Sequence, residues 1–146
     1  MFPLEWIQQA ATRIAPYILH TPLTWDHDLD LALKWDNHQV TGSFKARGAL
    51  NKVLCMSPWE YDHGLVAASA GNHGQGVALA GKIVGANVTI FASEHAIPIK
   101  ICAMQELGAQ VNLVSGGYGE AEQAGIAYAL ANQAAWISPY NDGQVI

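Results

Sequence analysis

Hydrophobic and polar positions divide the chain into a short N-terminal region and a longer region of regular alternation. Near the N-terminus, apolar residues recur three or four positions apart, which predicts an amphipathic helix over residues 3–15 that ends at Pro16. Residues 26–28 are typical of a turn between two short extended pieces, the second over residues 29–34. The first part of the chain is therefore expected to contain one helix and one pair of extended segments.

A second helix is predicted next, with the Ser43 hydroxyl as its N-cap and its apolar positions ending at Leu54. Beyond Pro58, strands and helices alternate. The predicted strands cover residues 65–69, 87–91, 110–114 and 135–138, and the predicted helices cover 74–84, 97–107 and 119–133. Strands joined by helices call for right-handed crossovers and a parallel sheet. The predicted fold class is therefore α/β, a three-layer Rossmann-like open parallel sheet with helices on both faces.

The composition is that of a soluble globular domain. The chain has 146 residues, of which 51% are hydrophobic and 13% charged, enough for one domain with its own core. Its formal net charge of −5 provides no basic surface for nucleic acid. No apolar stretch reaches the roughly 18 residues that a membrane span needs, and the N-terminus does not have the pattern of a secretory leader. We expect a cytoplasmic protein that binds neither nucleic acid nor membrane.

The histidines and cysteines do not indicate a metal site. None of the six histidines has metal-ligand spacing to another histidine or to a cysteine. Cys55 and Cys102 each fall inside an apolar helical pattern, where small buried side chains are expected. No metal is predicted, and the cysteine usage favours a reducing compartment.

Residues 41–48 place a single lysine, Lys45, beside glycine at the start of a predicted helix. A lysine amine can hold an aldehyde cofactor covalently, and the apolar Phe44 next to it would help to shield that amine from water. On its own, such a lysine would more often be a solvated side chain in the first turn of a helix. Only a second motif can favour the cofactor interpretation.

Residues 69–76 lie where a predicted parallel strand ends and a helix begins, which is where open α/β sheets bind ligands. Free backbone N–H groups there favour an anion such as a carboxylate, and Gly71 and Gly74 lack Cβ atoms, so a planar ring can approach the backbone. Asn72 could donate an amide hydrogen bond to a phenolate oxygen. Taken alone, the segment could equally be an ordinary connection with a capping asparagine, and His73 a structural histidine.

A dinucleotide site is a weaker interpretation of the same segment. Gly71, Gly74 and Gly76 do not have the GxGxxG spacing, and the next predicted strand ends at Phe91 rather than at an acidic residue. We therefore do not expect a dinucleotide here.

Taken together, residues 41–48 and 69–76 resemble the signature pair of the tryptophan-synthase-β-like (fold type II) pyridoxal-phosphate (PLP) enzymes, and within them the threonine/serine dehydratase (ammonia-lyase) branch. Further similarity covers residues 20–23, 33–34, 107–109 and 138–140. The resemblance implies PLP as the cofactor and L-threonine or L-serine as the substrate, which is converted to a 2-oxo acid and ammonia. It also implies a two-domain enzyme, with residues 1–50 in the large PLP-binding domain and residues 51–146 as the small Rossmann-like domain.

The resemblance assigns a role to each candidate site residue. Lys45 is the catalytic residue, which holds the cofactor as a Schiff base and later acts as the base at the substrate Cα. The cofactor-binding residues are Phe44, which packs beside the ring, Lys45, and Asn72, which bonds to the 3′-oxygen. The substrate-binding residues, which hold the carboxylate, are Ser69, Gly71, Asn72 and His73.

Two positions separate branches of the family. Ala70 stands where the related serine racemases have a second serine that acts as the acid and base on the opposite face. Ala46 follows the lysine where threonine and cysteine synthases tend to have an aspartate soon after it. Both residues favour elimination. Asp36 is a departure, because the family commonly has a glutamate before the asparagine at this place.

The second glycine-rich loop of the family, which holds the cofactor phosphate, does not occur in this sequence. We therefore expect the chain to be the N-terminal portion of a longer enzyme, weakly active or inactive alone, and a homo-oligomer at full length. A racemase or synthase of the same fold is one alternative. The other is a non-catalytic α/β module that binds an amino acid and in which Lys45 is idle.

Overall fold

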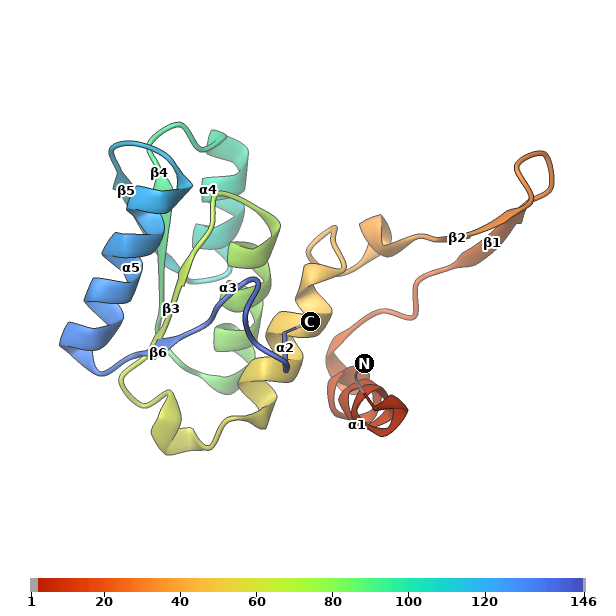
Figure 1. Ribbon diagram of the computed structural model, residues 1–146, viewed down its shortest axis with the longest axis horizontal. Helices are drawn as coiled ribbons and strands as arrows, with labels where there is room; N and C mark the ends of the chain where they lie inside the picture. The colour runs from red at the N-terminus through yellow and green to blue at the C-terminus, as the bar shows by residue number, and fades with distance from the viewer. Residues whose placement is uncertain (1–2, 146) are drawn as a thin grey trace.

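The computed structural model describes residues 3–145, which form a parallel sheet with helices on both faces and a projecting N-terminal region (Figure 1). The helices are α1 (Leu4–Ile14), α2 (Lys45–Cys55), α3 (Asn72–Val84), α4 (Pro98–Glu106) and α5 (Tyr118–Asn132), with short 3-10 turns at Ala15–Tyr17, Asp36–His38 and Pro58–Glu60. The strands are β1 (Leu23–Asp26), β2 (Leu31–Lys34), β3 (Leu65–Ala68), β4 (Val88–Ser93), β5 (Gln110–Val114) and β6 (Ala135–Trp136).

The main sheet has the strand order β5-β4-β3-β6, and all of its strands run parallel. The chain passes from β3 through β4 to β5 in one direction and then returns to place β6 on the other side of β3. The direction of winding therefore reverses between β3 and β6. In open α/β sheets, the crevice at the carboxyl ends of strands at such a reversal is the usual ligand site.

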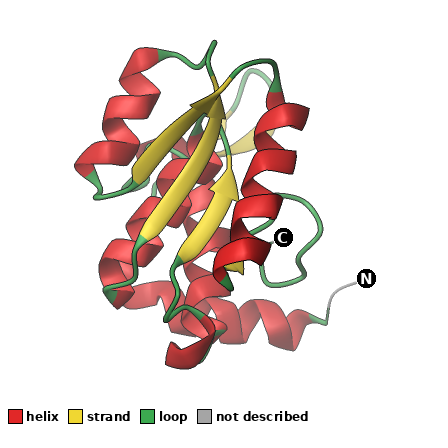
Figure 2. Cartoon of the chain, turned by 90° about the vertical axis from the view of Figure 1, so that its left-hand side faces the viewer, coloured by secondary structure: helices red, strands yellow, loops and turns green. Residues whose placement is uncertain are grey.

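Helices cover the two faces of the sheet, which confirms the predicted three-layer α/β class (Figure 2). A large core that includes Leu50, Val77 and Ile90 joins the sheet to α3 and, beyond it, to α2. A smaller core on the opposite face contains Val66 and Phe91 and packs against α5. The parallel strand β3 is buried along its whole length, as expected for a central strand that is covered on both sides.

Helices α2 and α3 approach each other closely at Gly76. A Cβ atom at this position would lie 3.0 Å from the backbone oxygen of Lys45 and 3.1 Å from the Cβ of Ala49. Glycine therefore lets the backbone of α3 pass beside the first turn of α2. This contact places the lysine motif against the helix that begins at the asparagine motif.

The N-terminal region lies outside the α/β unit. Strands β1 and β2 form an antiparallel hairpin that pairs Leu23 with Lys34 and projects away from the sheet (Figure 1). Helix α1 contacts α2 but buries only Ile14 fully. This region carries exposed large apolar side chains: Leu4, Trp6, Ile7, Leu19, Leu23, Trp25, Leu29, Leu31, Leu33 and Trp35.

An ion pair fastens this region to α2. Arg47 donates from Nε to Oδ2 and from a terminal nitrogen to Oδ1 of Asp36, at 2.9 Å in both cases. The Thr21 hydroxyl also donates to Asp36, at 2.5 Å. These hydrogen bonds, chiefly the one from Arg47, lower the pKa of Asp36 from 3.8 to about 2.

Acid is therefore expected to weaken the fold through Asp36. Its pKa is lower in the folded state, so the contribution to stability is present above the unfolded-state pKa and is lost as pH falls from about 5 towards 2. Because both side chains are partly exposed, we expect about 1 to 2 kcal/mol. Urea unfolding at several pH values should show this loss for the native chain and for the exposed-carboxylate control Asp62→Asn. If the unfolding free energy of Asp36→Asn falls with pH as steeply as that of the native chain, the assignment to Asp36 is contradicted.

Several sequence-based expectations need correction. Helix α2 begins at Lys45 rather than after Ser43, and Phe44 is its N-cap. The Ser43 hydroxyl accepts the Lys45 N–H at 3.3 Å but does not cap the helix. Cys55 and Cys102 are exposed, not buried. Cys55 is the last residue of α2, and α4 buries only Met104, so neither cysteine faces the core.

The span expected for strand β4 is also too short. The strand continues past Phe91 to Ser93, and Glu94 follows directly, so an acidic residue does stand at its end. The glutamate accepts hydrogen bonds from the Ser115 hydroxyl at 2.7 Å and from the Gly116 N–H at 3.1 Å, which tie it to the next loop. The glycine spacing remains the argument against a dinucleotide.

The predicted domain division after residue 50 falls inside α2 and stays a prediction.

Candidate active site

Lys45 is the first residue of α2 and is half-buried. Its Nζ donates to the backbone oxygen of Pro139 at 3.4 Å and lies 5.4 Å from the centre of the Phe44 ring. The hydrogen bond is long and therefore weak. The Lys45 amine is thus held beside the segment that follows β6, and no acidic side chain among residues 3–145 pairs with it.

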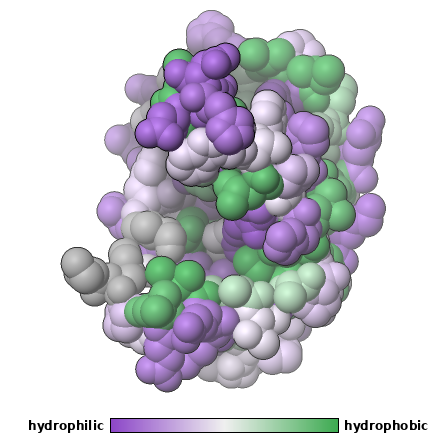
Figure 3. Space-filling model, turned by 90° about the vertical axis from the view of Figure 1, so that its right-hand side faces the viewer, coloured by the Kyte–Doolittle hydropathy of each residue, from purple (hydrophilic) through white to green (hydrophobic). Residues whose placement is uncertain are grey.

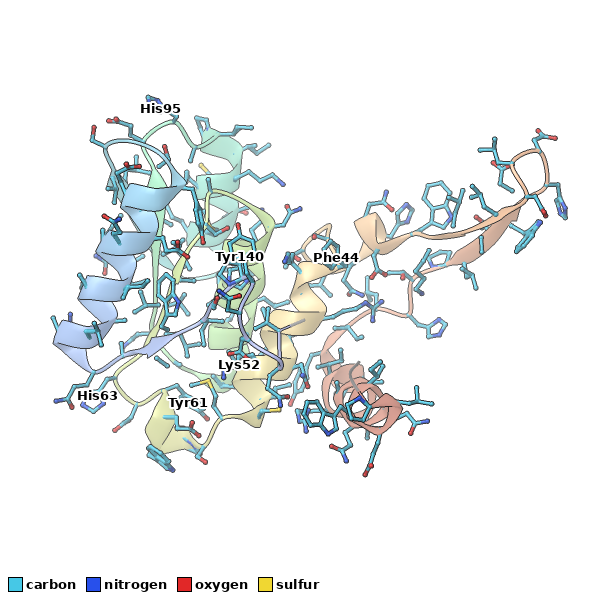
Figure 4. All side chains as sticks on the ribbon, in the orientation of Figure 1. Phe44, Lys52, Tyr61, His63, His95 and Tyr140 are labelled. Atoms are coloured by element: carbon cyan, nitrogen blue, oxygen red, sulfur yellow. The ribbon has the colours of Figure 1, made fainter. Side chains whose placement is uncertain are left out.

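Phe44 is itself 59% exposed at the start of α2, and Figure 4 labels it together with Tyr140 of the segment that follows β6. Tyr140 is 58% exposed and contacts the ring of Tyr118 edge to face. Phe44 is thus the ring that lies beside the Lys45 amine, whereas the Tyr140 ring packs against α5. Phe44 fits its predicted place beside a ring, and that role stays a prediction.

The connection between β3 and α3 carries the asparagine motif. The Ser69 hydroxyl accepts the Gly71 N–H at 3.1 Å, which closes a tight turn before the helix. A Cβ atom at Gly71 would meet no atom within 4 Å, so this backbone borders open space. Because the N–H groups of a first helical turn have no partner within the helix, the start of α3 suits an anion.

His73 is buried, and its Nε2 lies 3.0 Å from the backbone oxygen of Ile137. A carbonyl oxygen only accepts, so Nε2 carries the hydrogen and Nδ1 is the free acceptor of a neutral ring. Burial lowers the pKa of His73, and the nearby charge of Lys45 lowers it further, against the hydrogen bond to Ile137. The imidazole therefore stays neutral at physiological pH.

The segment after β6 joins the two motifs. Lys45 donates to Pro139 and His73 donates to Ile137, so the first turns of α2 and α3 bind the same short stretch of backbone. This stretch leaves the sheet at the side of β3 where the winding reverses. The structure thus brings Lys45, Ser69, Gly71 and His73 to one corner of the fold.

Asn72 behaves differently from the other predicted residues. It is exposed at the start of α3, and its Oδ1 accepts a hydrogen bond from Lys100 of α4 at 2.9 Å. No hydrogen bond joins it to Lys45 within residues 3–145. Sequence reasoning missed Lys100, although a lysine two residues after Pro98 at a helix start was a usable signal. It also missed the backbone carbonyls of Ile137 and Pro139, which have no sequence signal.

A separate groove of about 710 Å³ lies between α1, α2 and the segment that follows β6. Phe44 and Lys45 line one side of it, whereas Asn72 and the rest of the β3–α3 connection do not. Figure 3 shows hydrophobic side chains around the hollow on this side of the molecule. The groove therefore covers only the lysine side of the predicted site, and the site is placed by the two motifs rather than by this groove.

The comparisons with known proteins decide the family. The family model described as pyridoxal-phosphate dependent enzyme matches residues 12–146. The chain belongs to this family of PLP-dependent enzymes. It is 40% identical to the L-threonine ammonia-lyase of Thermotoga maritima over 152 residues, which cover 100% of the chain and 38% of that relative. The chain spans about two fifths of the length of the curated relatives that it matches.

Solved structures of PLP enzymes have the same fold. The processed form of threonine deaminase isoform 2 from Solanum lycopersicum matches with a TM-score of 0.89 and 30% identity, covering 97% of this chain and 41% of that chain. Maize serine racemase matches with a TM-score of 0.90 and 27% identity, covering 97% and 45%. The fold type II assignment is therefore confirmed, while ammonia-lyases and racemases are both similar to this chain.

The residues at the corner of the fold are compatible with PLP. Among the described residues, the buried Nδ1 of His73 has no hydrogen-bond partner, and neither has the buried Oγ1 of Thr41, four residues before Lys45. Open space borders Gly71, and the Lys45 amine has only one weak hydrogen bond. An aromatic aldehyde with polar substituents matches this combination of a free amine, an open backbone and unpaired polar atoms.

Residues 3–145 contain neither a membrane-spanning helix nor a cluster of metal ligands. None of the described helices combines the length and apolar character needed to cross a membrane. Within the same residues, no three histidine, cysteine or carboxylate side chains gather as a metal site would require.

Proposed function

We propose that this chain carries the lysine and asparagine motifs of a PLP-dependent enzyme that dehydrates and deaminates L-threonine or L-serine to a 2-oxo acid and ammonia. The observation that supports this most is the meeting of the two motifs on the segment that follows β6, at the reversal point of the sheet. The ammonia-lyase relatives support the reaction class.

Each predicted residue has a role that suits its position. Lys45 would hold the cofactor through its amine and, once the substrate amine has displaced it, take up the proton of the substrate Cα as the β-hydroxyl leaves. The backbone of Ser69 and Gly71 and the first turn of α3 would bind the substrate carboxylate. The neutral His73 fixes the start of α3 through Ile137. When bound, PLP supplies the electron sink for the negative charge that develops at Cα.

The test of this function incubates the chain with PLP and L-threonine or L-serine. We expect equal amounts of 2-oxo acid and ammonia, formed slowly, because the chain spans only part of its relatives. Calorimetry in parallel should show that L-threonine binds only after PLP. Binding of L-threonine that is equally tight without PLP, with no 2-oxo acid formed, would contradict the proposal and favour a non-catalytic amino-acid-binding module.

Racemisation is a second candidate function, because the maize serine racemase is as similar in structure as the threonine deaminase. Ala70 is the discriminating position: it is exposed and directly precedes Gly71. A methyl group cannot donate or accept the proton on the second face of Cα. The native chain should therefore eliminate rather than racemise.

Ala70→Ser is expected to raise the ratio of D-amino acid to 2-oxo acid by at least about tenfold. This is less than the rate increase that a well-placed proton-transfer group contributes. Chiral chromatography of the reaction with L-serine measures this ratio. The control Ala70→Gly, which also changes the side chain but adds no hydroxyl, should leave it unchanged. If the native chain already racemises faster than it eliminates, the second candidate replaces the first.

A further inference from the structure

Lys100 stands at a place that helix stability does not explain. It is the third residue of α4, and the first turn of a helix is where the helix dipole disfavours a positive charge. No acidic residue stands in this first turn to offset that charge. The half-buried Lys100 side chain instead reaches Asn72, the first residue of α3, and donates to its Oδ1 at 2.9 Å.

The chemistry of lysine determines how the Asn72 amide is turned. An ammonium group has only donors, so the amide must present its oxygen to Lys100. The Nδ2 amino group then points away from Lys100 and keeps both of its N–H donors for another acceptor. Without this contact the amide could rotate by half a turn and present an oxygen where a donor is needed.

We propose that Lys100 is a positioning residue of the cofactor site, which holds Asn72 so that its Nδ2 donates to the phenolate 3′-oxygen of PLP. This inference rests on the proposed function, because it takes Asn72 as the residue that binds the cofactor. Lys100 acts through Asn72 and is not itself placed in contact with the reacting atoms. Its hydrogen bond links two helix starts, α3 and α4, which otherwise meet through the core.

The first test needs no cofactor. Nitrogen relaxation of the Asn72 side-chain amide reports how firmly that group is held, and we expect an order parameter above about 0.6 in the native chain. Lys100→Met should lower it to less than about 0.6, while Lys100→Arg, which keeps a donor, should restore it. The control Lys82→Met, at an exposed lysine of α3, should change nothing. An unchanged value in Lys100→Met overturns the proposal.

The second test measures PLP binding by fluorescence titration. Lys100→Met should weaken the apparent Kd about tenfold, and Lys100→Arg should recover most of this, as expected for one hydrogen bond to a charged oxygen. A Kd that stays unchanged while the Asn72 amide loosens would overturn the link to the cofactor. If the native chain binds no PLP, the proposed function fails, and the cofactor role of Lys100 fails with it even where the relaxation result stands.

Discussion

Replacement of Lys45 by alanine is expected to abolish covalent retention of PLP by the chain. Lys45 is the lysine of the first glycine-containing motif, and among the described residues its Nζ makes one hydrogen bond, the 3.4 Å bond to Pro139, besides lying over the Phe44 ring. An amine so weakly bonded is free to attack an aldehyde. We expect the amount of PLP that survives borohydride treatment and gel filtration to fall on the order of 100-fold, to the background left by the other lysines.

The matched control is Lys82→Ala, at an exposed lysine near the end of α3. It removes the same side chain from a neighbouring helix and should leave PLP retention unchanged. Circular dichroism of both variants should match the native chain, because Lys45 is only half-buried and makes no ion pair in the described structure. Retention of PLP by Lys45→Ala at the native level would show that another amine holds the cofactor.

The second large effect is expected at the seam between α2 and α3. Gly76→Val would force a branched side chain against the Lys45 backbone oxygen and the Ala49 Cβ, which already lie 3.0 and 3.1 Å from the place of a single Cβ. These neighbours are fixed parts of α2 and cannot move aside alone. We expect a loss of about 2 to 3 kcal/mol in unfolding free energy, measured by urea denaturation, and weaker PLP retention because Lys45 is displaced.

Gly119→Val is the control for this substitution. Gly119 lies in the first turn of α5, is exposed, and would meet no atom within 4 Å of an added Cβ. The change in backbone entropy is similar in the two variants, so the difference between them reports the packing at the seam. Equal stabilities for the two variants would show that α2 and α3 are not in close contact at Gly76.

Much of the fold can be predicted from the sequence because local patterns determine it. The apolar run that forms β3 and the helices that separate the strands are enough to predict a parallel, covered sheet. Strand order is not predictable in this way. The return of β6 to the side of β3 depends on how α5 packs across the sheet, and this packing creates the crevice where the motifs meet.

The site is predictable to the extent that side chains carry it. Lys45 and the residues of the β3–α3 connection stand in recognisable motifs, whereas the bond of His73 to the Ile137 carbonyl has no sequence signal because every residue has a carbonyl. The prediction that the cysteines are buried is wrong for a related reason. Helical spacing shows that a helix has an apolar face, but not whether a cysteine within that pattern points towards the core. The predicted strand ends at Phe91 and so misses Glu94, because β4 continues for two further residues before the glutamate.

Peptide mapping shows directly whether Lys45 is the residue that holds the cofactor. The chain is incubated with PLP, reduced with borohydride, digested with trypsin and analysed by mass spectrometry. A label on Lys45 blocks cleavage there, so we predict a labelled peptide that spans residues 35–47. A label found instead at Lys34, Lys52, Lys82 or Lys100 would show that Lys45 is not the residue that binds PLP.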